Sequence, residues 1–238
     1  MNKSNIIYGR TPVLTCLQAG RRPVYKIYIQ QGLSLTEFKK WEGHIPIEEK
    51  PRGYLDRITK NGVHQGIVAE VEELHLLNFD DFLQNYSAQT KKMVVLDHLE
   101  DPRNLGAIIR SAVAFHINTI FLPQEGSAPI TPVVVKASTG AIEYAQMVQV
   151  KSTLQTVRKL KELGFGIYAL DADGNIKLNE VKWQNQSVLV IGSEGKGIRP
   201  LIKRECDYVI SIPTKPPMEQ LNASVSASIA FYAMSLSG

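Results

Sequence analysis

The first 75 residues alternate short segments with helical and strand periodicity. Residues Val24–Ile29 alternate apolar and polar side chains like a half-buried strand, and His64–Val71 has a similar pattern. Thr11-Pro12 is typical of a helix start, and Gly20 of a helix end. These signals predict a small α/β domain over residues 1–75. Its further elements are predicted as helices over Leu35–Trp41 and Tyr54–Thr59 and a short strand over Ile45–Ile47.

From residue 93 onward the predicted strands are almost continuously apolar, and helical segments separate them. Such strands are typical of a parallel sheet with both faces covered by helices. We therefore predict a second, larger α/β domain over residues 93–238, with residues 76–92 as a linker. The predicted strands are Met93–Leu96, Thr119–Leu122, Ile167–Leu170, Val188–Ile191 and Tyr208–Ile212, and the helices are Leu105–Phe115, Val133–Ala141, Thr153–Leu163 and Asn222–Leu236.

Composition narrows the functional class only slightly. The chain has 238 residues, 44% of them hydrophobic, and a net charge of +4, which permits a polyanionic partner without requiring one. Its two cysteines, Cys16 and Cys206, form no ligand cluster, so we expect a reducing compartment and no metal site. We find neither a signal-peptide core nor an apolar run of membrane-spanning length, and expect a soluble, cytoplasmic protein without a membrane partner.

The loop after the first strand of the larger domain has the sequence Asp101-Pro-Arg-Asn-Leu-Gly106 and is followed by Arg110. Asn104 stands where a helix is expected to begin, so it suits a helix N-cap. Arginines beside a helix N-terminus also suit an anion site, because their charge adds to that of the free backbone N–H groups. The segment alone does not choose between these two interpretations.

The loop after the strand at 188–191 has three glycines in the six residues Gly192-Ser-Glu-Gly-Lys-Gly197. Glycines permit close approach of a ligand to the backbone. A Walker phosphate loop would need Ser or Thr after Lys196, and a dinucleotide-binding loop would need a third spaced glycine. An ordinary tight turn remains an alternative, but a turn does not explain Glu194.

The loop before the last helix combines Ile212-Pro213 with Leu221-Asn222-Ala-Ser224. Here Asn222 again suits a helix N-cap, and the following serines suit close packing. In an open α/β sheet, ligands bind at the carboxyl ends of the strands. All three loops follow predicted strands, so we expect them at the same edge of the sheet.

Taken together and in this order, the three segments resemble the three motifs of the SpoU (TrmH-type) RNA ribose 2′-O-methyltransferases of the SPOUT superfamily. The resemblance covers essentially the whole chain, because Tyr8-Gly9 and His64–Ala69 are similar to the family's small substrate-binding domain. Among subfamilies, the similarity is greatest to the enzymes that methylate a guanosine ribose in 23S rRNA of the large ribosomal subunit.

The resemblance implies an α/β fold whose C-terminal SPOUT domain contains a parallel sheet and a deep trefoil knot. It also implies S-adenosyl-L-methionine (AdoMet) as cofactor, a homodimer with the active site near the dimer interface, and RNA as substrate, with rRNA favoured and tRNA as an alternative. The implied cofactor-binding residues are Gly192, Gly195, Ile212 and Leu221, and the implied catalytic residues are Arg110, Asn104, Glu194 and Asn222.

Within this resemblance, we interpret Arg110 as the group that clamps an RNA phosphate and stabilises the developing alkoxide, since its pKa is too high for a general base. Basic and aromatic side chains of the N-terminal domain suggest a docking face for an RNA loop, with a solvated surface as the alternative. The residues of this proposed face are Tyr8, Arg10, Arg21, Arg22, Tyr25, Lys26, Arg52, Tyr54, Arg57 and Lys60.

Two positions depart from the family pattern: Gln220 replaces the usual serine before Leu-Asn, and Pro216 replaces the usual glycine. They are the sequence support for an alternative, a non-catalytic RNA-binding or ribosome-assembly protein with the same fold. A phosphate-binding enzyme built on the glycine loop is a third possibility, against which the missing Walker Ser/Thr argues. Retained AdoMet binding distinguishes a methyltransferase from both.

Overall fold

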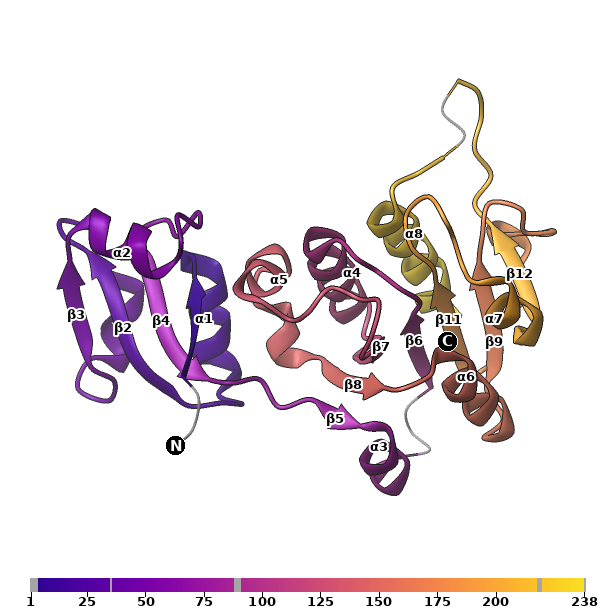
Figure 1. Ribbon diagram of the computed structural model, residues 1–238, viewed down its shortest axis with the longest axis horizontal. Helices are drawn as coiled ribbons and strands as arrows, with labels where there is room; N and C mark the ends of the chain where they lie inside the picture. The colour runs from indigo at the N-terminus through magenta and orange to yellow at the C-terminus, as the bar shows by residue number, and fades with distance from the viewer. Residues whose placement is uncertain (1–3, 35, 88–90, 218–219, 238) are drawn as a thin grey trace.

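The computed structural model describes residues 4–34, 36–87, 91–217 and 220–237, which form two sheets in two α/β units (Figure 1). The smaller, N-terminal sheet has the strand order β1-β4-β2-β3, with β4 antiparallel to both neighbours and β3 parallel to β2. Its elements are β1 (Ser4–Tyr8), α1 (Arg10–Ala19), β2 (Val24–Gln30), η1 (Thr36–Trp41), β3 (Ile47–Lys50), α2 (Arg52–Ile58) and β4 (Ile67–Glu72).

The boundaries of these elements differ from the predicted ones for local reasons. Gly20 ends α1 in the left-handed conformation as expected, but the helix begins two residues earlier than predicted, after Gly9 rather than after Thr11. The strand predicted from His64 begins only at Ile67, because residues 64–66 form a turn. In that turn the Gly66 N–H donates to Nδ1 of His64 at 2.9 Å, and Gln65 has a positive φ.

The larger sheet has the strand order β10-β12-β9-β11-β6-β7-β8-β5, and all of its described pairs are parallel. Its strands are β5 (Leu77–Asn78), β6 (Lys92–Leu96), β7 (Thr119–Pro123), β8 (Gln146–Val150), β9 (Gly166–Leu170), β10 (Ile176–Lys177), β11 (Ser187–Ile191) and β12 (Tyr208–Ser211). The helical elements are α3 (Phe79–Asn85), α4 (Pro102–Ala114), α5 (Pro132–Ala137), η2 (Ala141–Tyr144), α6 (Thr153–Glu162), η3 (Leu178–Glu180), α7 (Pro200–Glu205) and α8 (Ala223–Ser235).

Helices cover both faces of this sheet, as its apolar strands predict. Along β6, Val94 and Leu96 belong to one core cluster together with residues of α4, α5 and α8. Met93 and Val95 belong to the other, with residues of α3 and α6. Because side chains alternate across a strand, a continuously apolar strand is needed to fill both cores. The predicted α/β class with a parallel sheet is therefore confirmed, and a trefoil knot is consistent with this fold.

The structure adds elements that the hydrophobic pattern did not reveal. Strand β8 was not predicted, because Gln146 and Gln149 interrupt its apolar positions. The helix predicted over 133–141 is divided into α5 and η2 around Ser138–Gly140. Helix α7 and the short β10 and η3 also lie in segments for which no element was predicted. These elements are short, so propensity and periodicity give them little signal.

The segment predicted as a linker, residues 76–92, contains β5 and α3 and packs against the larger sheet. β5 pairs with β8 in parallel register, and Phe82 of α3 is only 2% exposed. The ring of Phe82 contacts that of Phe121 on β7 at 5.0 Å between centroids, in a T-shaped arrangement. Phe79 and Tyr86 extend the same aromatic cluster. Aromatic side chains that bury this much surface against a sheet make the segment part of its core.

We expect Phe82→Ala to destabilise the protein by about 3–5 kcal/mol, the usual cost of removing a buried phenylalanine. Gln84→Ala, an exposed position on the same helix, is the matched control and should change stability by less than about 0.5 kcal/mol. Urea unfolding followed by circular dichroism measures both. Equal stability of the two variants would contradict the assignment of α3 to the core.

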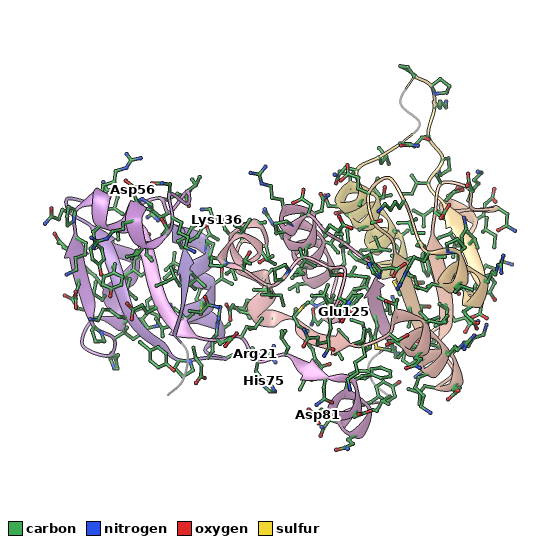
Figure 2. All side chains as sticks on the ribbon, viewed as in Figure 1. Arg21, Asp56, His75, Asp81, Glu125 and Lys136 are labelled. Carbon is green, nitrogen blue, oxygen red and sulfur yellow. The ribbon has the colours of Figure 1, made fainter. Side chains whose placement is uncertain are left out.

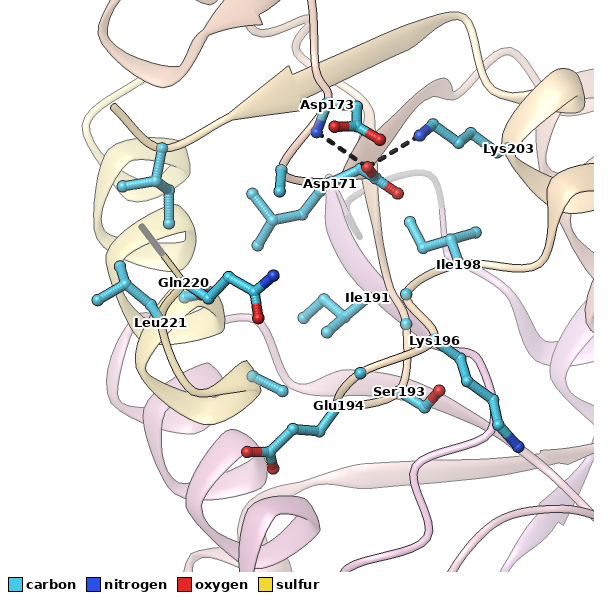
Figure 3. A pocket seen from close by; sticks show the side chains of 18 of the residues that line it. Asp171, Asp173, Ile191, Ser193, Glu194, Lys196, Ile198, Lys203, Gln220 and Leu221 are labelled. Carbon is cyan, nitrogen blue, oxygen red and sulfur yellow. Dashed lines mark hydrogen bonds and ion pairs between the residues drawn. The ribbon is translucent and has the colours of Figure 1, made fainter. Parts of the chain in front are cut away.

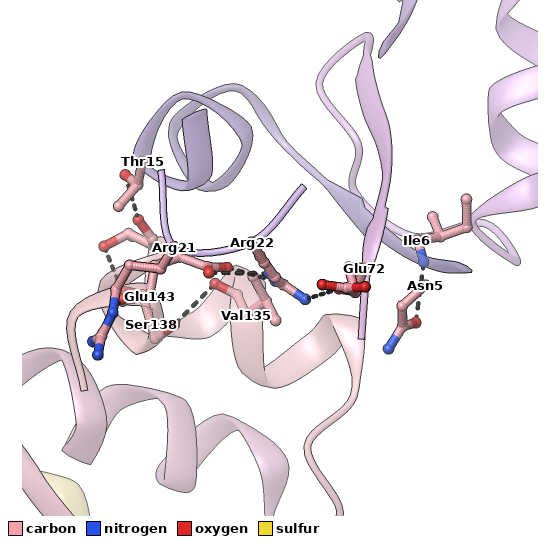
Figure 4. A network of polar contacts seen from close by, with 10 residues as sticks. Asn5, Ile6, Thr15, Arg21, Arg22, Glu72, Val135, Ser138 and Glu143 are labelled. Atoms are coloured by element: carbon pink, nitrogen blue, oxygen red, sulfur yellow. Dashed lines mark hydrogen bonds and ion pairs between the residues drawn. The ribbon is translucent and has the colours of Figure 1, made fainter. Parts of the chain in front are cut away.

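A buried ion pair joins the two units (Figure 4). Arg22 donates from Nε and Nη2 to the Glu143 carboxylate at 3.0 and 2.5 Å, and from Nη1 to the Glu72 carbonyl at 2.8 Å. The two charged side chains are 5% and 0% exposed. A buried charge without its partner costs several kcal/mol, so this pair holds the N-terminal unit in one position against η2. Arg22 is therefore unable to serve in the docking face predicted for RNA.

Other contacts at this interface involve α1 and α5. The Lys136 ammonium on α5 donates to Oε1 of Gln65 at 2.5 Å, and burial lowers the pKa of Lys136 (Figure 2). Cys16 lies on the buried face of α1 with 1% exposure, as its apolar helix face predicts. Burial raises the pKa of its thiol to about 12. A thiol held in the protonated form is a poor nucleophile, so Cys16 serves packing.

Candidate active site

The three loops meet at the carboxyl edge of the larger sheet. After β6 the chain builds β7 and β8 on one side, and later places β11 on the other side of β6. The boundary between β6 and β11 is thus a topological switch point, where open α/β sheets form their binding crevices. The first two motif loops follow these two strands, so the order of the strands brings together segments about ninety residues apart.

Asp101, rather than Asn104, caps α4. Its carboxylate accepts from the Arg103 N–H at 2.7 Å, and Pro102 occupies the first helical turn. Asn104 therefore lies inside the first turn, with 7% exposure. The N-cap interpretation of Asn104 is wrong, and its amide is available for contacts with other loops.

Asn104, Glu194 and Asn222, one residue from each loop, form a triangle of hydrogen bonds. Nδ2 of Asn104 donates to Oε2 of Glu194 at 2.7 Å, and Nδ2 of Asn222 donates to Oδ1 of Asn104 at 3.1 Å and to Oε2 of Glu194 at 3.3 Å. Three residues predicted as catalytic are thus brought within contact of one another.

The capping contact of α8 orients this triangle. Oδ1 of Asn222 accepts from the backbone N–H and the hydroxyl of Ser224, at 2.9 and 2.6 Å. Its Nδ2 must then point toward Asn104, and the Asn104 amide in turn directs its own Nδ2 to Glu194. The helix-cap interpretation of Asn222 and its functional one are therefore compatible: the cap fixes the side chain that the site uses.

The glycine loop is closed on itself and tightly packed at its base. Ser193 and Gly197 exchange two backbone hydrogen bonds at 2.9 and 3.2 Å, and Gly195 and Gly197 have positive φ. A Cβ built on Gly192 would lie 2.1 Å from the carbonyl carbon of Gly197, whereas one on Gly195 would meet no atom within 4 Å. Gly192 is thus required by packing and Gly195 by backbone conformation.

A cavity of about 1050 Å³ opens between the glycine loop, the end of β9 and the start of α8 (Figure 3). The four predicted cofactor-binding residues line it, as do Glu194 and Asn222. Apolar side chains from the strand ends form its walls, and charged groups stand at two separate ends. The predicted cofactor-binding residues in the lining are Gly192, Gly195, Ile212 and Leu221, and the apolar walls include Leu170, Ile191, Ile198 and Val209.

An ion pair between Asp97 and Arg199, for which the sequence predicted no role, ties the end of the glycine loop to β6. Asp97, fully buried at the end of β6, accepts from the Arg199 backbone N–H at 3.0 Å and from its guanidinium Nη2 at 2.7 Å. Arg199 directly follows the glycine loop, at the N-terminus of α7. An aspartate immediately after a buried strand was the only available signal, and its partner is 102 residues away.

Arg110 takes no part in the hydrogen bonds of the triangle. It is exposed on α4 and is not among the described residues that line the cavity. In the N-terminal unit, Tyr8 and Arg22 are each buried, so the docking face is smaller than predicted. Arg10, Lys26 and Arg52 stay accessible but pair with neighbouring carboxylates.

Two further observations concern metal ions and membranes. Among the described residues, no group of three or more His, Cys, Asp or Glu side chains is arranged to hold a metal ion. Over residues 4–34, 36–87, 91–217 and 220–237, no helix is long and apolar enough to cross a membrane.

Comparison with protein families agrees with the fold. A family described as the SpoU rRNA methylase family matches residues 91–232, and one described as RNA 2′-O ribose methyltransferase substrate binding matches residues 6–77. The chain belongs to the SpoU methylase family, and it is a methyltransferase with a substrate-binding domain at its N-terminus.

Relatives with similar sequences carry the same broad description. A protein of Mycolicibacterium vanbaalenii, named an uncharacterized tRNA/rRNA methyltransferase, is 38% identical over 95% of this chain and 74% of its own length. A similarly named protein of Mycobacterium leprae is 37% identical over 96% of this chain and 76% of its own length.

Solved structures show the same fold at lower identity. The SpoU methyltransferase AviRb from Streptomyces viridochromogenes, solved in complex with AdoMet, matches with a TM-score of 0.80 at 22% identity, over 98% of this chain and 90% of that one. A structure described as an RNA 2′-O ribose methyltransferase matches with a TM-score of 0.83 at 22% identity, over 99% of this chain and 89% of that one.

Proposed function

We propose that the protein transfers the methyl group of AdoMet to a ribose 2′-hydroxyl of RNA. The observation that carries this proposal is the Asn104–Glu194–Asn222 triangle, which joins the three loops and contributes Glu194 and Asn222 to the cavity lining. Family membership supplies the class of reaction, and the 2′-hydroxyl is the ribose group that distinguishes RNA from DNA.

The cavity suits AdoMet. Apolar side chains line its walls, Ile198 among them, and such walls suit an adenine ring. AdoMet supplies an activated methyl group on a positively charged sulfur. Glu194 at the cavity rim provides a negative charge that is complementary to that sulfur.

The polar triangle acts by positioning. Methyl transfer requires the attacking oxygen, the methyl carbon and the sulfur in line, so orientation provides much of the rate. We assign Asn104 and Asn222 to holding Glu194 and the target ribose in place, because their amides are fixed by the α8 cap. Arg110, exposed on α4, is assigned to the RNA phosphate and to the alkoxide that develops when the hydroxyl loses its proton.

For the substrate we propose 23S rRNA, with a guanosine ribose as the target, on the similarity of the motifs to that subfamily. tRNA is the alternative, and the relatives' names include both RNAs. Purified protein incubated with tritiated AdoMet and either rRNA or tRNA lacking the modification distinguishes them. Label in rRNA alone supports the proposal, and label in tRNA alone contradicts the proposed substrate. AdoMet binding without label in either pool directs the same assay to a ribosomal particle.

We further propose that two copies associate through α8. Val225, Ile229, Tyr232 and Leu236 are 37–67% exposed and recur every three or four residues, which places them on one face of the helix. Exposed apolar stripes of this kind mark interaction surfaces. We favour a second copy of the chain as the partner on this face. The stripe starts just after Leu221 and Asn222, which line the cavity, and the resemblance implies a dimer interface near the active site.

Ile229→Glu is expected to convert a dimer into a monomer of 26.5 kDa, because it introduces a charge into the apolar stripe. Leu201→Glu, an exposed apolar position on α7, is the control and should leave the mass unchanged. Light scattering after gel filtration measures both. A monomeric wild-type protein, or a dimer that survives Ile229→Glu, would contradict the proposed interface.

A further inference from the structure

Asp171 lies in the cavity wall at the carboxyl end of β9, across the cavity from Glu194 of the glycine loop (Figure 3). Neither the three motifs nor the mechanism proposed above uses it. Its side chain is 13% exposed, which is low for a carboxylate at the end of a strand. A carboxylate accepts hydrogen bonds, so Asp171 can also bind a donor on the molecule that fills the cavity.

The backbone around Asp171 is tightly fixed. Its N–H donates to the Ile210 carbonyl at 2.9 Å, and its carbonyl accepts from the Gly174 N–H at 3.1 Å. A Cβ on Gly174 would lie 2.3 Å from the carbonyl carbon of Ile210, so the turn is packed directly on β12. Asp171 is therefore presented to the cavity by a rigid turn.

The two oxygens of this carboxylate face different surroundings. Oδ1 pairs with the Lys203 ammonium at 2.8 Å and accepts from the Asp173 N–H at 3.1 Å. Oδ2 faces the glycine loop, where a Cβ built on Gly197 would lie 3.5 Å from it. Lys203 thus occupies the Oδ1 side of the carboxylate, and Oδ2 points toward the space between β9 and the glycine loop.

The neighbours of Asp171 indicate which part of AdoMet this space suits. Leu170, Ile198 and Val209 line the same part of the cavity, and apolar walls of this kind suit the adenine ring. The ribose is covalently joined to the adenine and carries two vicinal hydroxyls. Carboxylates at strand ends recognise ribose hydroxyls in this way in other α/β folds.

We propose that Asp171 accepts hydrogen bonds from the ribose hydroxyls of AdoMet through Oδ2, and so selects a ribonucleoside cofactor. The inference rests on the proposed function, because it takes AdoMet as the occupant of the cavity. The rigid turn on β12 holds the carboxylate in place. Lys203 pairs with Oδ1 and makes no contact of its own to the ribose.

Isothermal titration calorimetry with S-adenosylhomocysteine and its 2′-deoxy and 3′-deoxy analogues tests the proposal. Wild-type protein should bind the ribose form about 10- to 100-fold more tightly than at least one deoxy analogue, the usual range for a hydrogen bond to a charged group. Asp171→Asn keeps the side-chain shape and should reduce this preference to less than about threefold. The loss should come from weaker binding of the ribose form, with that deoxy analogue bound as before.

Lys203→Met is the matched control, since it removes the ion pair and keeps the carboxylate. It should retain the preference for the ribose form. If Asp171 only fastens β9 to α7, both variants will weaken all three ligands equally, and the proposal is wrong. A wild-type protein that binds the ribose and deoxy forms equally also overturns it, while the proposed function stands. A wild-type protein that binds no S-adenosylhomocysteine overturns the proposed function as well.

Discussion

Gly192→Ala is expected to weaken AdoMet binding by at least about 100-fold, because the new Cβ has no space. It would lie 2.1 Å from the Gly197 carbonyl carbon and 2.3 Å from the Ile198 nitrogen. These are backbone atoms, so the loop itself must shift, and a displacement of about 1 Å in a binding site costs on the order of 10²-fold. Calorimetric titration with AdoMet measures the affinity, and thermal unfolding shows whether the variant remains folded.

Gly195→Ala is the comparison for this experiment. Gly195 has a φ of +85° but open space around it, so alanine there introduces strain of about 1–2 kcal/mol without a collision. We expect Gly195→Ala to lower the unfolding temperature slightly and to bind AdoMet better than Gly192→Ala. Wild-type affinity in Gly192→Ala would show that the base of the glycine loop does not hold the cofactor.

Arg110→Ala is expected to lower kcat by about 10²–10³-fold, the usual effect of removing a group that stabilises a developing oxyanion. Its effect on AdoMet affinity should be small, because Arg110 is exposed and outside the cavity lining that the structure describes. Single-turnover methylation measured at saturating RNA separates the chemical step from RNA binding.

Arg110→Lys tests the charge in this prediction. It keeps a cation but loses the planar fork that binds phosphate bidentately, so we expect partial activity between that of wild type and Arg110→Ala. If Arg110→Ala binds RNA normally and methylates it at the wild-type rate, the assigned role of Arg110 is wrong.

The sequence predicted the parts of the fold whose signals are local. The continuously apolar strands at 93–96 and 188–191 predicted a buried parallel sheet, and the three loops after strands predicted where residues would gather. Asp101-Pro102 is itself the usual pattern of a helix start, so the correct cap of α4 was available in the sequence. The residue type of Asn104 also suits a helix cap, but Asp101 occupies that position in the structure.

The remaining features depend on contacts between distant residues. Arg22 looked like a surface cation, and nothing near it in the chain marks Glu143, 121 residues away, as its partner. Residues 76–92 looked like a linker because β5 has only two residues and is completed by β8. Asp171 carried no motif, and its importance appears only when the end of β9 is placed opposite the glycine loop.

If this protein transfers a methyl group to a ribose 2′-hydroxyl, the position of the methyl group in the product RNA will show it. RNA labelled by the wild-type protein with tritiated AdoMet should be hydrolysed in alkali and its products separated. A 2′-O-methyl group blocks cleavage of the adjacent phosphodiester, so we predict that the label appears in an alkali-resistant dinucleotide. Label in a methylated base, released as a mononucleotide, would contradict the account.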